Sequence, residues 1–459
     1  MHIRLFRQHL PVAFVLLVVL DAAVFLLAAG FSTLIDRQLV TIRELPVMLV
    51  VVGIMSFSVA SMGLYSPRQR ARLEGILVRL AAAALMSMGV AAAVFFFFPA
   101  AGATQGLLIR SIVLAGLGAW LLRVIFYHAI DENIFRRRVV VYGAGRRSRT
   151  ITELRRRTDL WGFRVVAFIR TEGDAPSFDS ALIVPEPVDL FGYCLEHRIA
   201  EIIVAMDDRR RGFPVERLLA CRLAGIEVTD LPDFLERETG KVRLDVLNPS
   251  WLIFGEGFTR NRARMTVQRA LDVVASLLIL ALASPIMLFA IIAVKIEDGW
   301  RQPVFYRQTR VGRDEVHFEI LKFRSMRVDA ESDGQARWAQ ARDARVTRVG
   351  SFIRRMRIDE LPQIFNVLQG HMSIVGPRPE RPQFVENFSN TIPYFRERHT
   401  VKPGLTGWAQ LCFSYGASAE DTMEKLQYDL YYVKNHSLAF DLIIILQTIE
   451  VVLWRKGAR

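Results

Sequence analysis

The sequence predicts a mixed membrane protein of three parts: four N-terminal transmembrane helices over residues 1–132, a Rossmann-like α/β domain over residues 137–257, and an α+β domain over residues 262–459 that contains a re-entrant membrane helix. Three observations support this prediction. Apolar residues make up 52% of the chain and are concentrated near the N-terminus, as transmembrane helices require. Short β-branched runs alternate with helical stretches in the middle of the chain. A second long apolar stretch follows, and basic residues flank both of its ends.

Each of four apolar stretches near the N-terminus approaches the roughly 20 residues that a membrane span needs. They lie at about residues 11–34, 45–65, 76–99 and 107–129. The first follows an arginine, as in a signal peptide, but it is long and further spans follow, so we expect it to be retained. Arg68, Arg70 and Arg72 follow the second stretch and Arg136–Arg138 follow the fourth, which places those ends in the cytoplasm. The spans are suited to anchoring and to assembly, including assembly into a homodimer.

The formal net charge of +13 indicates a negatively charged partner, either nucleic acid or an anionic membrane surface. Lys and Arg gather beside the apolar stretches, and the chain has no zinc-finger or recognition-helix pattern, so we predict membrane lipids and no nucleic acid as partner. Asp21 is the one charge that we expect within the spans, and it is functional, snorkels to the interface, or pairs with a neighbouring helix. Cys194, Cys221 and Cys412 have neither disulfide nor metal spacing, which is typical of reduced cytoplasmic thiols.

The middle domain is predicted from four β-branched runs, RVVVYGAG, RVVAFI, EIIVAM and IEVTDL, with helical stretches between them. This alternation is typical of a parallel sheet with crossover helices. Gly143 and Gly145 open the first strand-to-helix turn, where a dinucleotide-binding loop would lie, but Ser148 takes the place of the third glycine. The domain therefore binds a nucleotide at this loop or, as the missing glycine favours, serves as a regulatory or structural module.

A membrane-anchored nucleotide-sugar epimerase or dehydratase is an alternative function for a chain with such a domain. That chemistry needs a tyrosine base whose pKa is lowered by a lysine one helical turn later. No tyrosine of the chain has a lysine four residues on, and Tyr431 with Lys434 lies outside the predicted Rossmann-like domain. The absence of this pair argues against the alternative.

Residues 271–296 are long and apolar enough to cross a bilayer, yet basic residues at both flanks satisfy the cytoplasmic rule. Ser284 and Pro285 lie near the midpoint, where proline bends a helix and the serine hydroxyl can bond a freed carbonyl. We expect this segment to enter and leave by the same leaflet; a kinked spanning helix is the alternative. Near the C-terminus, residues 424–434 are predicted helical, and residues 438–454 form an interfacial amphipathic helix or a short span.

Between these segments, VFYRQTRVG and VHFEILKFRSM predict two strands joined by a turn near residues 312–315. Lys322 and Arg324 would point to one side of the second strand, spaced for phosphate oxygens, although surface cations are the default for such residues. Arg378 lies between two prolines and Glu380 follows. A stiff backbone suits an arginine whose planar fork grips a diphosphate.

The densest cluster of charge follows this strand pair. Asp359 and Glu360 are adjacent, and Pro362 and Gly370 bracket a short helix after them, because proline suits a first turn and glycine a helix end. Two carboxylates share one site only if cations lie nearby; Arg354 and its neighbouring arginines would supply part of the charge and a divalent metal the rest. A solvated helix with an ion pair one turn apart is the plainer interpretation.

The motifs LKFRSM, DELPQIFNVLQG, MSIVGPRPE and KPGLTGWAQ occur in this order between residues 321 and 410. Together they resemble the bacterial polyprenyl-phosphate sugar-1-phosphate transferases, the monotopic phosphoglycosyl transferases that begin capsule and exopolysaccharide assembly. The resemblance covers roughly residues 260–459. Larger members of that family carry four spans and a Rossmann-like domain ahead of the catalytic part, and their re-entrant helix is broken at Ser-Pro.

The resemblance implies transfer of a sugar-1-phosphate from a UDP-sugar to undecaprenyl phosphate, with release of UMP, at the cytoplasmic face of the bacterial inner membrane. It assigns Asp359 as a nucleophile that forms a covalent phosphosugar intermediate. Glu360 would hold Mg²⁺ together with Asp359 or orient the lipid phosphate. The predicted substrate-binding residues are Lys322, Arg324, Arg354, Arg378 and Glu380. A non-catalytic membrane scaffold is the remaining alternative.

Overall fold

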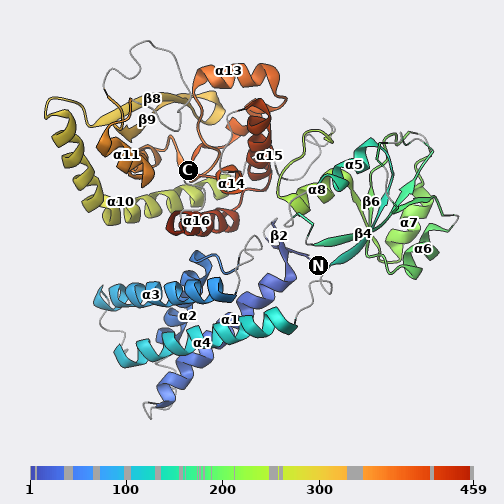
Figure 1. Ribbon diagram of the computed structural model, residues 1–459, viewed down its shortest axis with the longest axis horizontal. Coiled ribbons are helices and arrows are strands. Elements are labelled where there is room, and N and C mark those ends of the chain that lie inside the picture. Colours follow the sequence, from blue (N-terminus) through green and yellow to red (C-terminus); the bar gives the residue numbers. More distant parts are fainter. Residues whose placement is uncertain are drawn as a thin grey trace. The chain divides into compact units, whose positions relative to one another are not determined.

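Figure 1 shows the computed structural model of the chain. The structure describes every residue except 1, 6–7, 36–44, 66–72, 98–104, 130–135, 155–158, 161, 173, 175–176, 179–180, 188, 211, 248–256, 258–261, 328–344, 414–417 and 455–459. The chain falls into two compact units, Met1–Val246 and Leu247–Arg459. Each unit is described by itself.

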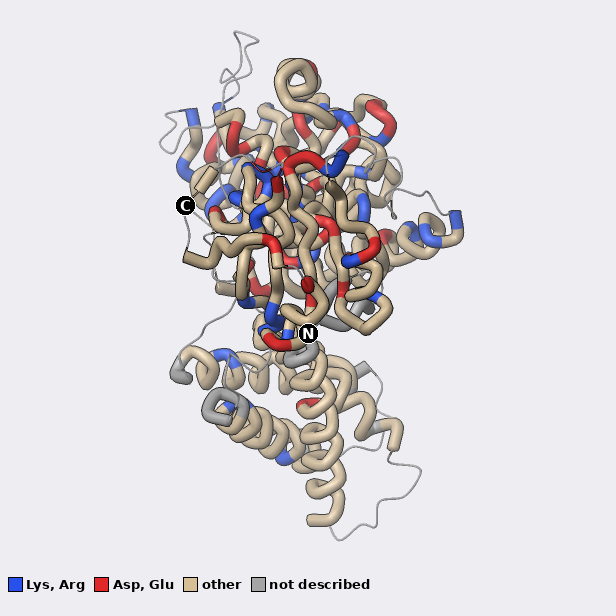
Figure 2. The backbone as a smooth tube through the Cα atoms, turned by 90° about the vertical axis from the view of Figure 1, so that its right-hand side faces the viewer, with Lys and Arg blue, Asp and Glu red and all other residues tan. Residues whose placement is uncertain are grey.

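The first unit begins with a short antiparallel strand pair and four helices, which lie at the four predicted spans. These elements are β1 (His2–Leu5), β2 (Gln8–Pro11), α1 (Val12–Ile35), α2 (Leu45–Ser61), α3 (Leu73–Phe97) and α4 (Gln105–Ala129). Helices α1, α3 and α4 are long and apolar enough to cross a membrane, whereas α2 is shorter than predicted, with 17 residues. Few charged residues lie along these helices (Figure 2). The predicted cytoplasmic arginines Arg68, Arg70 and Arg72 lie outside the described residues.

A buried ion pair joins α1 to α4. Both terminal nitrogens of Arg123 donate to Asp21, at 3.0 and 2.8 Å, and the Tyr65 hydroxyl donates to the same carboxylate at 2.7 Å. Arg79 of α3 is buried as well and donates to the Met62 carbonyl at 2.7 Å. The expectation that Asp21 is the one charge within the spans is therefore wrong. Its pairing with a neighbouring helix is what the structure shows, since a charge in an apolar layer is costly unless it is paired.

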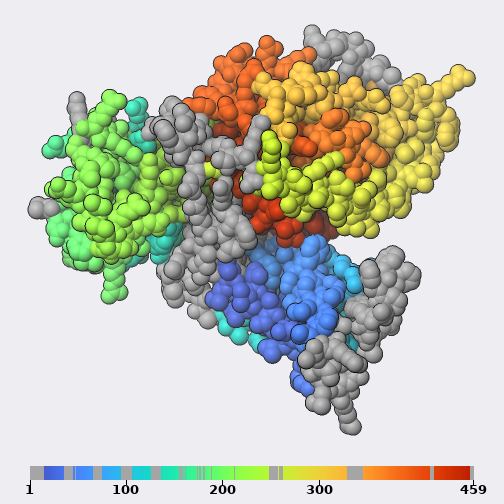
Figure 3. Space-filling model, turned by 180° about the vertical axis from the view of Figure 1, so that it is seen from behind, coloured from blue at the N-terminus to red at the C-terminus, as the bar shows by residue number. Residues whose placement is uncertain are grey.

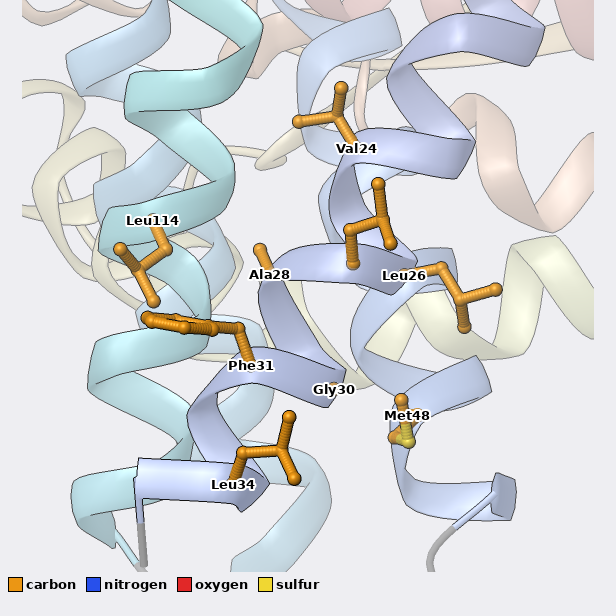
Figure 4. A pocket seen from close by; sticks show the side chains of 9 residues that line it. Val24, Leu26, Ala28, Gly30, Phe31, Leu34, Met48 and Leu114 are labelled. Carbon is orange, nitrogen blue, oxygen red and sulfur yellow. The ribbon is translucent and has the colours of Figure 1, made fainter. Parts of the chain in front are cut away.

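An apolar groove lies between α1, α2 and α4 (Figure 4). Phe31 of α1 and Leu114 of α4 point toward each other at one side of it, and Met48 of α2 lies at the other. Its lining consists of apolar side chains and Gly30. Such a surface is suited to hydrocarbon, where polar groups are costly.

The rest of the first unit is a doubly wound α/β domain. Its elements are β3 (Arg137–Tyr142), α5 (Arg146–Thr152), β4 (Phe163–Arg170), β5 (Ile183–Pro185), α6 (Leu190–Glu196), β6 (Glu201–Val204), α7 (Val215–Leu223), β7 (Glu227–Asp230) and α8 (Leu231–Thr239). The strands are parallel and lie in the order β5-β4-β3-β6-β7, with the first strand of the domain in the middle. This is the strand order of dinucleotide-binding folds. The four predicted strands are present, and β5 is an addition.

Both faces of this sheet are covered. Val139 and Val141 of β3 belong to a core that includes Phe234 of α8. The alternate residues Val140 and Tyr142 belong to a second core on the opposite face, with α6 and α7. Side chains alternate across a strand, so a near-continuous apolar run such as β3 requires helices on both sides.

The second unit is an α+β domain built around one long helix. Its elements are α10 (Arg262–Asp298), β8 (Phe305–Val311), η2 (Arg313–Glu315), β9 (His317–Phe323), α11 (Arg348–Arg355), η3 (Ile358–Glu360), α12 (Gln363–Gln369), β10 (Ser373–Val375), α13 (Pro382–Thr391), η4 (Phe395–Thr400), β11 (Gly404–Thr406), α14 (Trp408–Cys412), α15 (Ala419–Asn435) and α16 (Leu438–Leu453). The predicted strand pair and turn are β8, η2 and β9, which pair antiparallel. The two predicted C-terminal helices are α15 and α16.

Helix α10 contains the apolar segment predicted to be re-entrant. It has 37 residues with Pro285 inside it, and the Ser284 hydroxyl donates to the Ala281 carbonyl at 2.9 Å. Figure 1 shows that the helix turns sharply rather than running straight. One face, including Met287 and Ala290, packs into the core of the unit, while large apolar side chains on the other faces are exposed. The space-filling view places α10 (yellow-green to yellow) on the outside of its unit (Figure 3). By length and composition alone the helix could also cross a membrane.

Candidate functional site

The acidic doublet lies in a short 3₁₀ turn that leads into α12. The helix predicted after the doublet is present: Pro362 directly precedes its first residue and Gly370 ends it with a φ of 91°, which glycine adopts at little cost. Arg357, just before the doublet, also has a left-handed backbone with a φ of 59°. A non-glycine residue pays about 1 kcal/mol for such a conformation. The surrounding structure therefore holds the turn that presents both carboxylates.

The Asp359 side chain is enclosed, since the residue is 8% exposed. Among the described residues, its carboxylate has no hydrogen-bond or ion-pair partner. Burial raises the pKa of this carboxyl to about 6, and the Glu360 charge adds to the increase, while Lys322 and Arg354 oppose it. A buried carboxylate without a bonded partner is suited to act as a base or a nucleophile. The plainer interpretation, a solvated helix, does not fit this burial.

Glu360 has the opposite environment. Its Oε1 accepts from the Arg378 guanidinium at 2.6 Å and from the Lys322 ammonium at 3.3 Å, and Arg357 lies 3.8 Å from Oε2. These cations outweigh burial and hold the pKa of Glu360 well below its usual range. In return, Glu360 raises the pKa of Arg378, whereas burial lowers the pKa of Lys322. The doublet thus combines one carboxylate whose pKa is held low with one whose pKa is raised to about 6.

The position of Arg378 is set by two motifs that pack together through glycines. Strands β10 and β11 pair in parallel, and they bring the SIVGPRPE and KPGLTG segments side by side. A Cβ on Gly404 would lie 2.0 Å from the Gly376 nitrogen, and one on Gly407 would lie 2.2 Å from the Gly376 carbonyl oxygen. Only glycine permits this approach. The two motifs therefore pack as one structural unit, and the Pro-Arg-Pro loop extends from this unit.

Arg398 is a residue of the site that the sequence analysis missed. Its guanidinium donates to the Arg378 carbonyl at 2.9 Å and pairs with Asp429 of α15 at 2.8 Å. Both side chains are buried. The Arg398–Asp429 pair therefore fixes the backbone at Arg378 through the Arg378 carbonyl, and the flanking prolines restrict the same backbone. Its position just before the KPGLTG motif was the available signal.

Lys322 is positioned by the amide of Asn366. The Asn366 amide nitrogen donates to the Glu319 carbonyl at 2.7 Å, and its oxygen accepts from the Leu321 nitrogen at 2.9 Å. Asn366 is buried, so loss of either bond would leave a buried polar atom of its own amide unpaired. This side chain fixes strand β9 to helix α12, which places Lys322 opposite Glu360.

The other predicted site residues lie around this group. Arg324 follows the last residue of β9, is buried, and donates to Asp298 at the end of α10 at 2.8 Å. Glu380 lies 3.6 Å from Arg310. Arg354 is half-buried in α11 and close enough to lower the Asp359 pKa. The structure thus brings Lys322, Arg354 and Arg378 to the doublet, and it engages Arg324 and Glu380 with other partners.

The predicted magnesium ion has a limited donor set. The described residues contain no group of three or more His, Cys, Asp or Glu side chains that could hold a metal. Mg²⁺ is commonly held by one or two carboxylates together with substrate phosphates. Asp359 has no bonded partner among the described residues, whereas Glu360 is already engaged by two cations. The residues fit Mg²⁺ only when a diphosphate completes its coordination.

Comparison with known proteins identifies the family. Residues 263–455 match the family model described as bacterial sugar transferase, and residues 60–212 match the one described as CoA-binding domain. The UDP-glucose:undecaprenyl-phosphate glucose-1-phosphate transferase of Xanthomonas campestris pv. campestris is 33% identical over 352 residues, which cover 74% of this chain and 71% of the relative. The chain belongs to the bacterial sugar transferase family.

Two further relatives extend this family assignment. The UDP-N-acetylgalactosamine-undecaprenyl-phosphate N-acetylgalactosaminephosphotransferase of Aeromonas hydrophila is 44% identical over 245 residues, 53% of this chain and 56% of the relative. The UDP-glucose:undecaprenyl-phosphate glucose-1-phosphate transferase of Caulobacter vibrioides is 42% identical over 193 residues, 42% of this chain and 71% of the relative. The chain thus spans little more than half of the Aeromonas protein. The predicted resemblance to the polyprenyl-phosphate sugar-1-phosphate transferases is confirmed, and all four motifs that carried it lie within the bacterial sugar transferase match.

Proposed function

We propose that the chain transfers a sugar-1-phosphate from a UDP-sugar to undecaprenyl phosphate and releases UMP, through a covalent intermediate on Asp359. The observation that supports this proposal best is the contrast within the doublet. Asp359 is buried without a bonded partner among the described residues, and Glu360 holds two cations beside it. The names of the relatives support undecaprenyl phosphate as acceptor and a UDP-sugar as donor.

In the first step, a carboxylate oxygen of Asp359 attacks the phosphorus that carries the sugar. The bond from this phosphorus to the bridging oxygen breaks, UMP leaves with that oxygen, and an acyl phosphate remains on Asp359. The attack brings one anion toward another, so its barrier depends on cations that are already in place. Lys322 and Arg378 together outweigh the single charge of Glu360 that they share. Their surplus positive charge is available to the diphosphate.

In the second step, an oxygen of undecaprenyl phosphate attacks the same phosphorus and releases the Asp359 carboxylate. The acceptor is insoluble in water, whereas the donor is soluble, so the reaction must take place at the membrane surface. A re-entrant α10, bent near Pro285 with exposed apolar side chains, would hold the site at headgroup depth. We place this site at the cytoplasmic face of the inner membrane, where it would begin the assembly of an exopolysaccharide, capsule or O-antigen repeat unit.

Mg²⁺ completes the proposal as cofactor. Asp359 would hold it together with the phosphates of the donor, and the ion would neutralise phosphate charge and act as a Lewis acid. Glu360 contributes mainly by orienting Lys322 and Arg378, because its Oε1 already accepts bonds from both. Arg324 and Glu380 would act indirectly, since Arg324 is bonded to Asp298 and Glu380 pairs with Arg310.

The test uses the purified full chain in lipid, with UDP-N-acetylgalactosamine, UDP-glucose and UDP-galactose as donors. With undecaprenyl phosphate and Mg²⁺, the wild-type chain is expected to release UMP from at least one donor. Without acceptor, it should release up to one UMP per chain and gain the mass of one phosphosugar. Asp359→Asn should lose turnover and the adduct, at least a 10²-fold effect, because an amide is not a nucleophile at phosphorus.

Glu386→Gln is the matched control, since it removes an exposed carboxylate of α13 and should leave UMP release unchanged. Turnover by folded, membrane-bound Asp359→Asn would refute the assignment of the nucleophile. UMP release that strictly requires acceptor, with no adduct, would indicate a single displacement. No UMP from any donor would favour the non-catalytic scaffold.

A further inference from the structure

The loop between β3 and α5 of the α/β domain is where a nucleotide phosphate would be expected. In dinucleotide-binding folds with this strand order, the pyrophosphate lies against the backbone N–H groups of this loop, at the N-terminus of the first helix. Part of the chain also matches the CoA-binding domain model, which extends over this loop. The N–H groups of the loop therefore show whether such a ligand fits.

The N–H groups at the start of α5 are already bonded to a carboxylate of the chain itself. The Arg146 nitrogen donates to one carboxylate oxygen of Asp207 at 2.8 Å, and the Arg147 nitrogen donates to the other, also at 2.8 Å. Asp207 lies just beyond the end of β6, the strand next to β3 in the sheet. A carboxylate that bridges two consecutive amides takes the place that a phosphate oxygen pair would occupy.

A second carboxylate accepts a hydrogen bond from a further N–H group of the loop. Asp174 follows β4, the second strand of the domain, after which dinucleotide-binding folds carry an acidic residue for the ribose hydroxyls. Here the Asp174 carboxylate accepts instead from the Ala144 nitrogen of the loop at 2.7 Å and from the Thr171 nitrogen at 2.9 Å. Its other oxygen accepts from the Asp207 nitrogen at 3.4 Å, which links the two acidic residues.

The glycines of the loop are explained by these contacts. In dinucleotide-binding folds the second glycine lets the backbone approach the pyrophosphate. In this chain, a Cβ on Gly145 would lie 2.2 Å from the Asp207 carboxylate. A Cβ on Gly143, where φ is +123°, would lie 2.6 Å from the Ala205 carbonyl carbon. Both glycines therefore serve the packing of the loop against β6 and Asp207, and neither requires a ligand.

We infer that Asp207 is an internal substitute for the nucleotide phosphate, so that the β3–α5 loop of this chain holds neither CoA nor a dinucleotide. A phosphate at the loop would have to displace Asp207 or lie beside it, and two anions in contact repel each other. Ala144, Arg146 and Arg147 have no free N–H to offer without breaking a bond to one of the two carboxylates. The domain is then a module whose loop is occupied by two of its own carboxylates.

The experiment measures amide hydrogen exchange of the loop in the purified full chain, with CoA or NADH added at millimolar concentration. Exchange of peptides covering residues 143–150 is expected to be the same with and without either compound. In Asp207→Ala, the same peptides should exchange at least about tenfold faster, because two amides lose a charged acceptor. Glu216→Gln, an exposed carboxylate of α7, should leave the exchange unchanged.

Slower exchange of the wild-type loop in CoA or NADH would overturn the inference, as would an Asp207→Ala loop that exchanges like wild type. The wild-type measurement needs no variant to fold, so it decides the question of ligand binding by itself. If Asp207→Ala does not fold, Asp207→Asn keeps one neutral acceptor oxygen and should show a smaller acceleration of the same peptides. These results are independent of whether the chain releases UMP.

Discussion

Two carboxylates on consecutive residues have different pKa values here because the available cations are shared unequally. Glu360 pairs with Lys322 and Arg378, and these cations stabilise its negative charge despite burial. Asp359 is left with burial and a negative neighbour, and its pKa rises to about 6. A carboxyl with such a pKa is still largely ionised at neutral pH, but its charge is poorly stabilised. This is the condition that favours a nucleophile over a structural ion pair.

The buried side chain of His399, next to Arg398, predicts that the stability of the protein depends on pH. Burial and the charges of Arg398 and Arg396 lower its pKa from 6.5 to about 3. Between pH 6.5 and about 3, the unfolded chain therefore binds a proton at His399 that the folded chain does not. The contribution of neutral His399 to the free energy of unfolding is fully present above pH 6.5 and is lost as pH decreases toward 3. The expected loss between pH 7 and pH 5 is about 2 kcal/mol.

The measurement compares unfolding of wild type and His399→Gln at both pH values. Glutamine does not titrate, so the difference in stability between the two proteins should shrink as pH falls. The raised pKa of Asp429 acts in the opposite direction, but it is common to both proteins and cancels in the comparison. His317→Gln, at an exposed position of β9, should behave as wild type. Parallel pH dependences for wild type and His399→Gln would show that His399 is not held neutral.

At the residue scale, the sequence could predict which charges gather but not how they pair. Adjacent carboxylates near several arginines indicated a shared site, because their repulsion requires cations. In an extended strand, Lys322 and Arg324 would be equally suited to bind phosphate. Strand β9 ends between them, however, and the Arg324 side chain donates to Asp298 instead. The Arg398–Asp429 ion pair and the hydrogen bonds of Asn366 join residues that are tens of positions apart in the sequence, so no local spacing could predict them.

At the element scale, the proposed position of the site at the membrane surface depends on helix α10. Pro285 near its middle predicted a bend, and the helix does turn sharply (Figure 1). The Ser284 hydroxyl donates to the Ala281 carbonyl at 2.9 Å. That bond is directed into the preceding turn, where a proline leaves backbone carbonyls without donors. The bend makes a re-entrant path available, and the flanking charges favour it.

Cysteine labelling tests this path. Val267→Cys and Trp300→Cys, at exposed positions on either side of the apolar segment, are introduced singly into a chain without its three native cysteines. Because a re-entrant helix leaves both ends inside, a membrane-impermeant maleimide should modify neither cysteine in intact cells and both in inverted vesicles. A periplasmic marker protein that carries a cysteine serves as the positive control. Modification of one position from outside would show that α10 spans the membrane.

The α/β domain illustrates a different limit of prediction at this scale. The alternation of strands and helices predicted the parallel sheet, since a fully buried strand leaves an apolar run in the sequence. The same pattern suggested a nucleotide loop through Gly143 and Gly145. The closure of this loop depends on Asp207, which lies 60 residues after Arg147 and just beyond the end of the neighbouring strand β6. Strand order had to be known before this carboxylate could be placed.

At the scale of the whole molecule, the residues of the candidate site belong to one unit. Every residue of the candidate site lies in Leu247–Arg459, and the bacterial sugar transferase match ends within it. The Caulobacter relative has 71% of its length aligned to 42% of this chain, so it is much shorter. A core of hydrophobic residues joins α10, β9 and α11 within the second unit.

A chain reduced to residues 247–459 is therefore expected to insert into membranes through α10 and α16. It should release UMP at a rate within about tenfold of that of the full chain, which corresponds to a change of at most about 1.4 kcal/mol in the activation barrier. UMP release by the fragment and by the full chain, each in the same lipid and at equal protein concentration, provides the comparison. Asp359→Asn in the fragment is the negative control. Asp207→Ala in the full chain should likewise retain turnover, because Asp207 lies in the other unit. A folded, membrane-bound fragment without activity would show that the N-terminal unit takes part in catalysis. The first residues to substitute would then be Arg123 and Asp21, whose ion pair joins α4 to α1.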